Sequence, residues 1–385
     1  MSSAASAGAA PGPAPGGPVL DIKDLQVVYR TPAGDVRAVD RMNLTLHAGE
    51  VVGLAGESGS GKSTLAYGAC RLLRPPALIT GGSVRYQGRR VSQPMEILRL
   101  NHDELKRLRW REIAIVFQSA MNALNPVLNV RDQLLDVMHA HLRLPRDETR
   151  ERASSLLDLV GIPRSRLRSD PHELSGGMRQ RISIAMALAT DPEIVIMDEP
   201  TTALDVVVQR DILAQIVELK ERLGFSILFI THDLSLLFEL ADRIAVMYAG
   251  QLLEVGTAHD IHHEASHPYT KGLINSFPSL RGGRRELAGI PGTPPDLRSP
   301  PPGCPFLPRC EYGTDACREV GMTLAPAGPL ASSGVPGLAG PSGDPGHVTA
   351  CPFVGPDTPL PQPPVAMAAT SEPGGAEPGG REPAP

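Results

Sequence analysis

Residues 56–64 read GESGSGKST, and this stretch decides the fold that we expect for the chain. It fits the pattern G-x-x-x-x-G-K-[ST] at every fixed position, between the apolar run VVGLA and the helical stretch TLAYGACRLL. In a strand–loop–helix context, glycines let backbone N–H groups converge on phosphate groups at the positive end of a helix. The stretch therefore predicts a nucleotide site, and this context disfavours the alternative of a merely flexible glycine loop.

The side chains of this loop have separate predicted tasks. Lys62 supplies a cation to the phosphates, and the hydroxyl of Ser63 is expected to bind Mg²⁺. The residues predicted to contact the nucleotide here are Gly56, Glu57, Ser58, Gly59, Ser60, Gly61, Lys62, Ser63 and Thr64.

An aliphatic run at 194–197 ends in two carboxylates, Asp198 and Glu199. Asp198, at the end of the expected strand, can hold Mg²⁺ directly or through water. Glu199 can then orient or deprotonate the attacking water. The alternative is an acidic pair in a solvated loop, which the complete phosphate loop upstream makes the weaker interpretation. Together the two motifs predict hydrolysis of a nucleoside triphosphate.

Apolar runs alternate with helical patterns from residue 19 to about residue 260, as in a packed α/β domain. Several runs are almost continuously aliphatic, which is typical of parallel strands buried on both faces. The strands expected on this basis are 51–53, 113–117, 194–197, 227–230 and 244–247.

Composition separates this domain from the two ends of the chain. Residues 1–18 and 354–385 are rich in Ala, Gly, Ser and Pro, and we expect disordered tails there. The net charge of −5 gives no electrostatic case for nucleic acid as a partner. No segment approaches the roughly 20 apolar residues that span a bilayer, and the N-terminus does not resemble a signal peptide. We expect an intracellular protein whose membrane role, if any, comes through a partner.

The sequence LSGGMRQR at 174–181 resembles the signature motif of ATP-binding-cassette (ABC) ATPases. In that family two nucleotide domains meet head to tail, and the signature of one completes the ATP site of the other. Donors on Ser175, Gly176 and Gly177 can reach a γ-phosphate at the start of the helix that runs through 179–189. The resemblance implies contacts to the partner's ATP from Ser175, Gly176, Gly177, Met178 and Gln180.

The resemblance to ABC ATPases covers about residues 19–260 and implies a fold. That fold is the P-loop NTPase nucleotide-binding domain, with a RecA-like core, a helical subdomain at about 119–187 and an antiparallel β-subdomain. A small C-terminal extension with four cysteines is expected at 261–353.

Four further residues match family elements in order. Tyr29 is placed to stack on adenine, although a tyrosine that packs on its own sheet is the alternative. Gln118 matches the glutamine that contacts Mg²⁺ or water and begins the segment facing the membrane domain; a surface glutamine is the alternative. Asp205 in TTALD matches the loop that crosses the dimer interface. His232 in FITHD matches the histidine against the γ-phosphate, where a packed histidine is the alternative.

The resemblance therefore implies a competent site for ATP and Mg²⁺. The catalytic residues are Glu199, His232, Gln118 and Lys62, and the Mg²⁺ ligands are Ser63, Gln118 and Asp198. Tyr29, Asp198, Gln118 and His232 join the phosphate loop in contacting ATP.

A finer resemblance, to the ATPases of oligopeptide/dipeptide importers of the D type, lies in QSAMNALNPVLNV at 118–130, the Met of LSGGM and HPYTKGLI at 267–274. The chain departs from that family in its long termini and in a Pro/Gly-rich insertion at 325–346. The resemblance implies a distinct F-type ATPase partner, two transmembrane permease subunits and an extracytoplasmic peptide-binding protein. It also implies a peripheral location on the cytoplasmic side of the cell membrane.

Three alternatives stay open at this point. A soluble ABC ATPase of DNA repair or translation would carry a second cassette, a coiled-coil insertion or a basic surface, and the sequence shows none of these. A regulatory module without turnover would need a damaged Glu199 or signature. The transported solute can be a peptide, nickel or another small solute.

Five cysteines occur, and four of them lie late in the chain. Cys70 is expected to be a buried small apolar residue. The others, Cys304, Cys310, Cys317 and Cys351, have the spacing C-x5-C-x6-C-x33-C. In an intracellular protein such clustering favours a metal over disulfides, but the spacing leaves iron–sulfur, zinc and free thiols open. The resemblance to the importer family, some members of which bind a [4Fe–4S] cluster in this region, implies an iron–sulfur cluster with a structural role.

Overall fold

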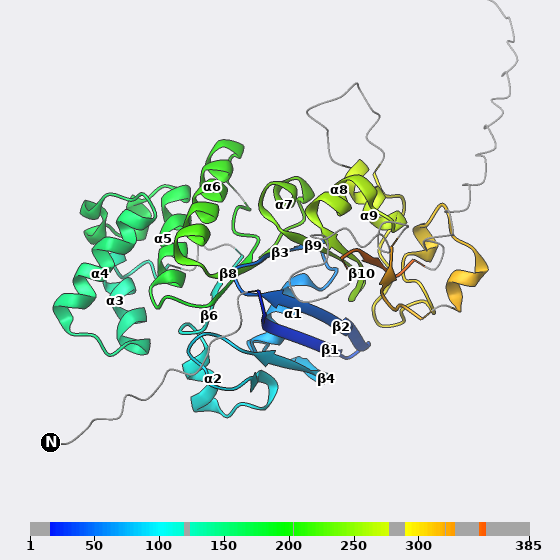
Figure 1. The fold of residues 1–385 in the computed structure, drawn as a ribbon, viewed down its shortest axis with the longest axis horizontal. Coiled ribbons are helices and arrows are strands. Elements are labelled where there is room, and N and C mark those ends of the chain that lie inside the picture. The colour runs from blue at the N-terminus through cyan, green and yellow to red at the C-terminus, as the bar shows by residue number, and fades with distance from the viewer. Residues whose placement is uncertain are drawn as a thin grey trace, which may run out of the picture.

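The computed structural model describes residues 16–118, 124–202, 204–276, 289–319, 321–327 and 346–351. Within these residues the chain forms two β-sheets with helices around them (Figure 1). The predicted tails at 1–18 and 354–385 and the insertion at 325–346 lie largely outside the described residues. The first strand begins at Pro18, so the end of the predicted N-terminal tail is already part of a sheet.

The larger sheet has the strand order β11-β12-β10-β9-β3-β8-β7-β6. Its strands are β3 (Val51–Ala55), β6 (Ile113–Val116), β7 (Ile194–Asp198), β8 (Ser226–Ile230), β9 (Arg243–Tyr248), β10 (Gln251–Thr257), β11 (Ala325–Pro326) and β12 (Val348–Thr349). Strands β6, β7, β8, β3 and β9 pair in parallel, and β10 is antiparallel to β9. All five strands predicted from the aliphatic runs are present.

Strand β7 shows why these runs are apolar on both faces. Val195 and Met197 pack into one apolar cluster together with the helices, and Ile194 and Ile196 pack into a second cluster on the opposite face. All four side chains are fully buried. Because successive side chains of a strand point to opposite faces, a strand covered on both sides has to be apolar throughout.

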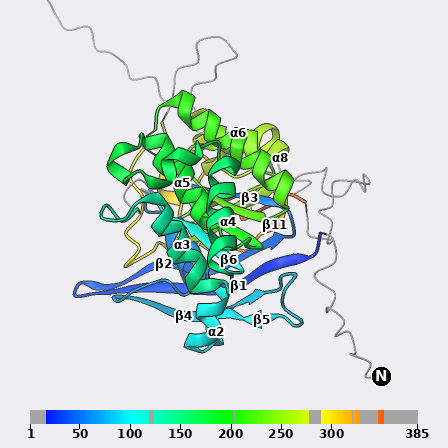
Figure 2. The same ribbon diagram turned by 90° about the vertical axis from the view of Figure 1, so that its left-hand side faces the viewer.

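The smaller sheet is antiparallel and has the order β2-β1-β4-β5. Its strands are β1 (Pro18–Thr31), β2 (Gly34–His47), β4 (Ala77–Tyr86) and β5 (Met95–Glu96). Helix α1 (Lys62–Ala69) buries Leu65 and Ala66 in the cluster that contains apolar residues of both sheets. Figure 2 shows β1, β2 and β4 below the helices α5 and α6. The mixed α/β architecture with an antiparallel sheet agrees with the fold expected from the sequence.

Helices gather at one end of the molecule, on the left in Figure 1. They are α3 (Val130–His141), α4 (Arg146–Leu159), α5 (Gly176–Leu188) and α6 (Val206–Leu223). Helix α4 packs against α3 and α5, and α5 packs against α6. The remaining helices are α2 (His102–Leu108), α7 (Leu234–Leu240), α8 (Ala258–Glu264) and α9 (Pro268–Asn275), with short 3₁₀ turns at 97–99, 164–168, 171–173, 307–309 and 315–318. None of the helices in the described ranges is long and apolar enough to cross a bilayer.

We call residues 261–351 the C-terminal segment. Its described part packs directly on the nucleotide-binding fold. Strand β12 pairs with β10, and β11 pairs with β12, so this segment extends the edge of the larger sheet. Phe306 is buried in the same apolar cluster as Tyr248 and Tyr269. The buried carboxylate of Glu254 on β10 pairs with His347 at 2.8 Å. These contacts between distant residues tie the segment to the fold, and its Pro/Gly-rich composition gave no sign of them.

Candidate active site

The phosphate loop lies between β3 and α1, and two of its glycines have backbones that other residues rarely adopt. Gly61 has φ +104°, and a Cβ there would lie 2.1 Å from the carbonyl oxygen of Ala38. Gly56 has φ +148°, and a Cβ there would lie 2.1 Å from the carbonyl oxygen of Met247. Since both neighbours are backbone atoms, a side chain at either position would have to displace the chain itself. The spacing of the motif is therefore fixed by close backbone approach.

Lys62 begins α1 and is buried, with 5% of its surface exposed. Its Nζ donates to the carbonyl oxygens of Gly56 at 2.7 Å and Glu57 at 2.8 Å. Burial lowers the pKa of Lys62, and the carboxylates of Glu199, Asp198 and Glu57 oppose this shift. The loop thus holds a desolvated cation against its own carbonyl groups, where an entering anion would be a stronger partner.

Asp198 ends β7 and is fully buried beside the first turn of α1. Ser63 donates to its Oδ1 at 3.0 Å, and Tyr67 donates to its Oδ2 at 2.6 Å. Burial raises the pKa of Asp198, while these two hydrogen bonds oppose the shift. A hydroxyl and a carboxylate are oxygen donors of the kind that Mg²⁺ prefers, so the pair fits this ion. Sequence reasoning missed Tyr67, although its position one helical turn after Ser63 places both on one face of α1.

Glu199 follows Asp198 and collects three side-chain partners. Gln118 donates to its Oε2 at 2.9 Å, Thr202 donates to the same oxygen at 3.0 Å, and His232 Nδ1 lies 3.2 Å from Oε1. Burial acts to raise the pKa of Glu199, but the hydrogen bonds from His232 and Thr202 outweigh it, and the net shift is downward. The carboxylate is therefore charged at neutral pH and can accept a proton.

These residues meet at one edge of the larger sheet because they follow neighbouring parallel strands. Gln118 comes after β6, Glu199 after β7 and His232 after β8, and β3 leads into the phosphate loop beside β8. The carboxyl ends of parallel strands form the usual ligand crevice of an open α/β sheet. The structure thus brings Lys62 close to Asp198, and Gln118 and His232 against Glu199; Gln118, which was expected among the Mg²⁺ ligands with Ser63 and Asp198, donates here to Glu199.

The remaining loop positions differ in exposure. Ser58 and Gly59 are exposed at the crest of the loop, and Ser60 is buried. Thr64 lies on α1, and its hydroxyl is 3.1 Å from the hydroxyl of Tyr29 on β1. Tyr29 is part-buried, so its ring is held beside the first turn of α1.

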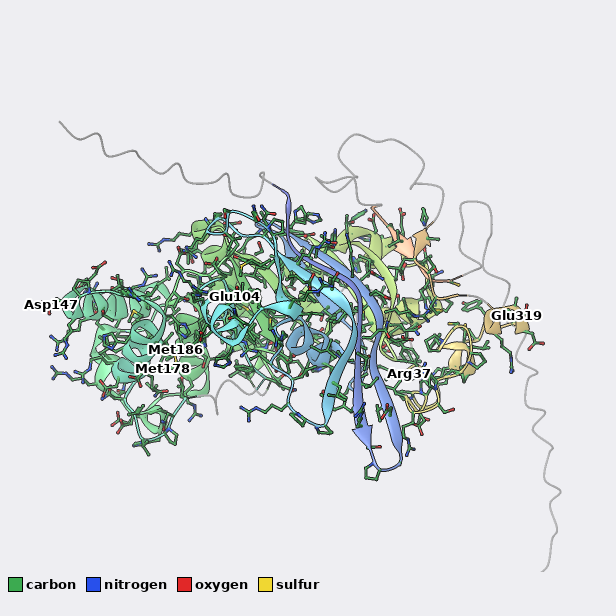
Figure 3. All side chains as sticks on the ribbon, turned by 90° about the horizontal axis from the view of Figure 1, so that it is seen from below. Arg37, Glu104, Asp147, Met178, Met186 and Glu319 are labelled. Atoms are coloured by element: carbon green, nitrogen blue, oxygen red, sulfur yellow. The ribbon has the colours of Figure 1, made fainter. Side chains whose placement is uncertain are left out.

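The signature residues lie at the start of α5, in the helical end of the molecule; Met178 is labelled there in Figure 3. Ser175 is exposed and caps α5 by accepting from the N–H of Met178 at 3.3 Å. Gly176 and Gly177 form the first turn. Gln180 is only 2% exposed, so its side chain does not share the exposed surface of Ser175.

Asp205 lies close to the signature and has a local role in the fold. Its side chain accepts from the N–H groups of Val207 at 3.1 Å and Val208 at 2.9 Å, which caps α6. A Cβ on Gly177 would lie 2.7 Å from Val208, so the first turns of α5 and α6 pack closely against each other. Val206 and Val207 are 69% and 71% exposed, which is unusual for apolar side chains.

The four late cysteines gather in the C-terminal segment. Cys304 and Cys317 are buried, Cys310 and Cys351 are half-buried, and the N–H of Cys304 donates to the carbonyl oxygen of Cys317 at 2.9 Å. Burial raises the pKa of Cys304 to about 12, and the other three thiols act in the same direction, which places all four in one region. Cys70, as predicted, is buried.

The arrangement of these thiols does not reproduce a metal site. In the described residues there is no group of three or more His, Cys, Asp or Glu side chains placed to hold a metal ion. The described cysteines form no disulfide with one another in the structure. The predicted iron–sulfur cluster therefore receives no support from the geometry, although the four donors do lie in one region.

Glu57 was predicted to contact the nucleotide, and the structure gives its side chain a different partner. Arg309 of the C-terminal segment binds both carboxylate oxygens of Glu57, at 2.7 Å and 3.0 Å. The backbone N–H of Glu57 donates to the hydroxyl of Tyr269 at 2.8 Å. Neither Arg309 nor Tyr269 was singled out from the sequence, since nothing local to either residue points to the phosphate loop.

Comparison with known proteins gives two matching families. The ABC transporter family matches residues 39–202, and the family described as the C-terminal region of oligopeptide/dipeptide transporters matches residues 253–317. The chain is 44% identical over 309 residues to the oligopeptide transport ATP-binding protein OppD of Salmonella typhimurium, covering 80% of this chain and 90% of that protein. It is also 44% identical over 311 residues to the dipeptide transport ATP-binding protein DppD of Bacillus subtilis, covering 80% and 91%.

Solved structures show the same fold. The dimeric ATP-binding cassette MJ0796 bound to ADP and Pi matches with a TM-score of 0.54 and 28% identity, covering 62% of this chain and 98% of that one. The protein cbiO1 of Clostridium perfringens, part of the ABC transporter complex cbiONQ, matches with a TM-score of 0.55 and 28% identity, covering 64% and 91%.

Proposed function

This chain belongs to the family of ATP-binding proteins of oligopeptide and dipeptide ABC transporters, and we propose that it is the ATP-hydrolysing subunit of a peptide importer. The observation that carries the chemistry is the grouping at the edge of the larger sheet. There a buried lysine, a hydroxyl–carboxylate pair and a charged, hydrogen-bonded glutamate lie side by side. The names of the relatives, an oligopeptide and a dipeptide transport ATP-binding protein, supply the peptide.

The residues of this chain divide the work of hydrolysis. Lys62 exchanges its carbonyl partners for phosphate oxygens of ATP, and the N–H groups of the loop and of α1 hold the remaining charge. Glu199 accepts a proton from the water whose oxygen bonds to the γ-phosphorus, while the bond to the bridging oxygen of ADP breaks. Gln118 and His232 hold the carboxylate of Glu199 in place. When Mg²⁺ is bound, Ser63 and Asp198 would hold it, and it neutralises phosphate charge.

A second subunit is part of this proposal. The exposed start of α5, with Ser175 and the N–H groups of Gly176 and Gly177, offers hydrogen-bond donors at the surface of the molecule. We place them on the ATP held by the phosphate loop of a partner ATPase, with Asp205 at the contact. The partner proposed from the sequence is a distinct F-type subunit, and a second copy of this chain is the alternative.

The rest of the transporter follows from the relatives. A peptide importer needs membrane-spanning permease subunits and a peptide-binding protein outside the membrane. The resemblance implies two permease subunits. We place this chain on the cytoplasmic face of the cell membrane, bound to the permeases through the segment that begins at Gln118. Closure of the ATPase pair on ATP would then move the permeases, and hydrolysis would reopen the pair.

We also propose an iron–sulfur cluster at Cys304, Cys310, Cys317 and Cys351. It rests on four thiols in one region, because soft thiolate donors suit such clusters, and no step of the mechanism runs through it. Iron and acid-labile sulfide in anaerobically purified protein would support it, with loss of both in Cys304→Ser and retention in Cys70→Ser. Protein without iron or sulfide would exclude it.

The function is tested by uptake of labelled dipeptides and oligopeptides in cells whose own copy of this gene is deleted. We expect uptake to return with the wild-type chain and not with Glu199→Gln, while both chains co-purify with two permease subunits from detergent extract. Uptake that returns equally with the variant would overturn the proposal.

A further inference from the structure

The C-terminal segment reaches into the nucleotide site through one residue of the phosphate loop. Glu57 is held at three points: its carboxylate by Arg309, its N–H by Tyr269, and its carbonyl oxygen by Lys62. Arg309 and Tyr269 lie inside the residues 253–317 that match the C-terminal family, and outside the residues 39–202 that match the ABC transporter family. A part of the chain beyond the cassette thus fixes a residue of the cassette.

The guanidinium of Arg309 is fixed from every side. It binds Glu57 in a two-pronged ion pair, and its other N–H groups donate to the carbonyl oxygens of Pro291 at 2.8 Å and Ile290 at 3.3 Å. It also donates to the hydroxyl of Tyr248 at 3.2 Å, and 4% of its side chain is exposed. A paired arginine with all of its donors engaged has little freedom, so it holds the carboxylate of Glu57 in one position.

Tyr269 holds the backbone of the same residue from α9. Its side chain is fully buried, and its ring lies 4.6 Å from that of Tyr248 and 5.3 Å from that of Phe306, centroid to centroid. The packed rings leave the hydroxyl of Tyr269 with one direction, toward the N–H of Glu57. The contact therefore depends on the register of α9 against the core and not on the loop itself.

Arg309 and Tyr269 together form what we call the clamp on Glu57. The charge of Glu57 explains why this clamp is needed. A carboxylate in a loop that receives a triphosphate repels the ligand and competes with it for Lys62. With Arg309 bound to both of its oxygens, the carboxylate is neutralised and directed away from the exposed crest of the loop. If Arg309 were absent, the half-buried carboxylate of Glu57 would be left with its electrostatic attraction to Lys62, whose Nζ already donates to the carbonyl of Glu57.

We propose that Arg309 and Tyr269 are positioning residues of the nucleotide site, through which the C-terminal segment sets the affinity of the phosphate loop for ATP. The proposal rests on the role of the phosphate loop given under the proposed function. Arg309 acts by neutralising Glu57, and Tyr269 acts by fixing the backbone of the loop. Neither residue touches the nucleotide.

The test is the dissociation constant for Mg–ATP and the steady-state kcat and KM of the purified full chain and its variants. We expect Arg309→Ala to weaken ATP binding about tenfold, with kcat at saturating ATP within about twofold of wild type. The double variant Arg309→Ala with Glu57→Gln should bind ATP within about threefold of wild type, because no unpaired charge is left. Arg298→Ala is the matched control, since Arg298 lies in the same segment and pairs with exposed Asp296.

A merely structural role of Arg309 would give a different pattern. The double variant would then bind ATP as weakly as Arg309→Ala, and that result, or unchanged affinity in Arg309→Ala, would overturn the proposal. If Arg309→Ala does not fold, two gentler variants decide: Arg309→Lys keeps the charge, and Tyr269→Phe removes one hydroxyl. Each should weaken ATP binding about threefold, and wild-type affinity in both would reject the clamp.

A Lys62→Ala arm separates this inference from the function beneath it. If Lys62→Ala loses ATP affinity while Arg309→Ala keeps it, the clamp alone is wrong. If Lys62→Ala also binds ATP normally, the role of the phosphate loop fails and the clamp fails with it.

Discussion

The phosphate loop and the signature loop are both glycine-rich, yet the fold treats them in opposite ways. Lys62 and Asp198 are almost completely buried; the ammonium of Lys62 donates to carbonyl oxygens of its own loop, and the carboxylate of Asp198 accepts from Tyr67, 131 residues earlier in the chain. Ser175 and Asp205 are exposed, and the contacts described for them are caps on their own helices. Groups that stabilise a developing charge work best when they are fixed and desolvated, whereas groups that complete another subunit's site must stay accessible. This difference is the one expected if, as we propose, each chain carries two unequal halves of an ATP site.

The largest effect is expected for the phosphate-loop half, from Glu199→Gln. The amide keeps the size of the side chain and cannot accept the proton of water, so kcat for ATP hydrolysis should fall about 10³-fold. ATP affinity should be retained, and the ATP-loaded pair should remain closed. Phosphate release measures kcat, and Glu239→Gln, a change at an exposed glutamate of α7, is the control. Multiple turnover at the wild-type rate would remove Glu199 from its assigned role.

The second largest effect is expected on the ATP affinity of the isolated chain, which depends on the phosphate loop and not on the signature loop. Lys62→Ala removes the buried ammonium that faces the phosphates, and the isolated chain should bind ATP about 10-fold to 100-fold more weakly. Equilibrium titration with nucleotide measures the loss, and Lys23→Ala, at an exposed lysine that pairs with Asp21, should show none. Unchanged ATP affinity in Lys62→Ala would contradict the assignment of the phosphate loop as the half of the site that binds ATP most strongly.

The third effect should appear only in the assembled pair. Ser175→Ala removes a donor aimed at the partner's nucleotide, so hydrolysis by the complete transporter should fall about tenfold. ATP binding by the isolated chain should be unchanged, because Ser175 is no part of its own phosphate loop. Ser154→Ala, at a half-buried serine of α4 whose hydroxyl donates to the carbonyl oxygen of Arg150 in its own helix, controls for a general effect on the helical end. A loss of affinity in the isolated chain would show that the two loops are not separate halves.

The smallest effect is expected from loss of the contact between Tyr29 and the adenine base of ATP. Tyr29→Ala should weaken ATP binding about threefold if the ring stacks on adenine, since aromatic contacts contribute about 0.5–1.5 kcal/mol. Tyr29→Phe keeps the ring, loses the contact of 3.1 Å with Thr64 and should bind ATP like wild type. If Tyr29→Phe is as weak as Tyr29→Ala, the hydroxyl contact matters and the stacking role is wrong.

Much of the site could be predicted because its chemistry is written in short stretches. Lys62 and Ser63 are neighbours in sequence, and Asp198 and Glu199 end one aliphatic strand. The family resemblance placed Gln118, Glu199 and His232 in one site, and the structure gives the physical reason: residues after adjacent parallel strands share one edge of a sheet. The partner of Asp198 at Tyr67 was missed because a tyrosine four positions after a serine is common in any helix. The iron–sulfur prediction rested on the resemblance to the importer family, because the spacing of the cysteines left zinc and free thiols open, and a resemblance does not fix the geometry that a metal requires.

The sequence by itself determined the α/β fold, the phosphate loop and the carboxylates, because each depends on residues within one strand–loop–helix unit. Only the tertiary structure decided that Glu57 faces Arg309, 252 residues further along the chain. That contact exists because β12 joins the larger sheet beside β10 and Phe306 packs against Tyr269, which brings the C-terminal segment to the phosphate loop. Local sequence patterns specify the local backbone conformation. The ion-pair partner of a charged side chain depends on which distant surfaces pack against each other in the complete fold.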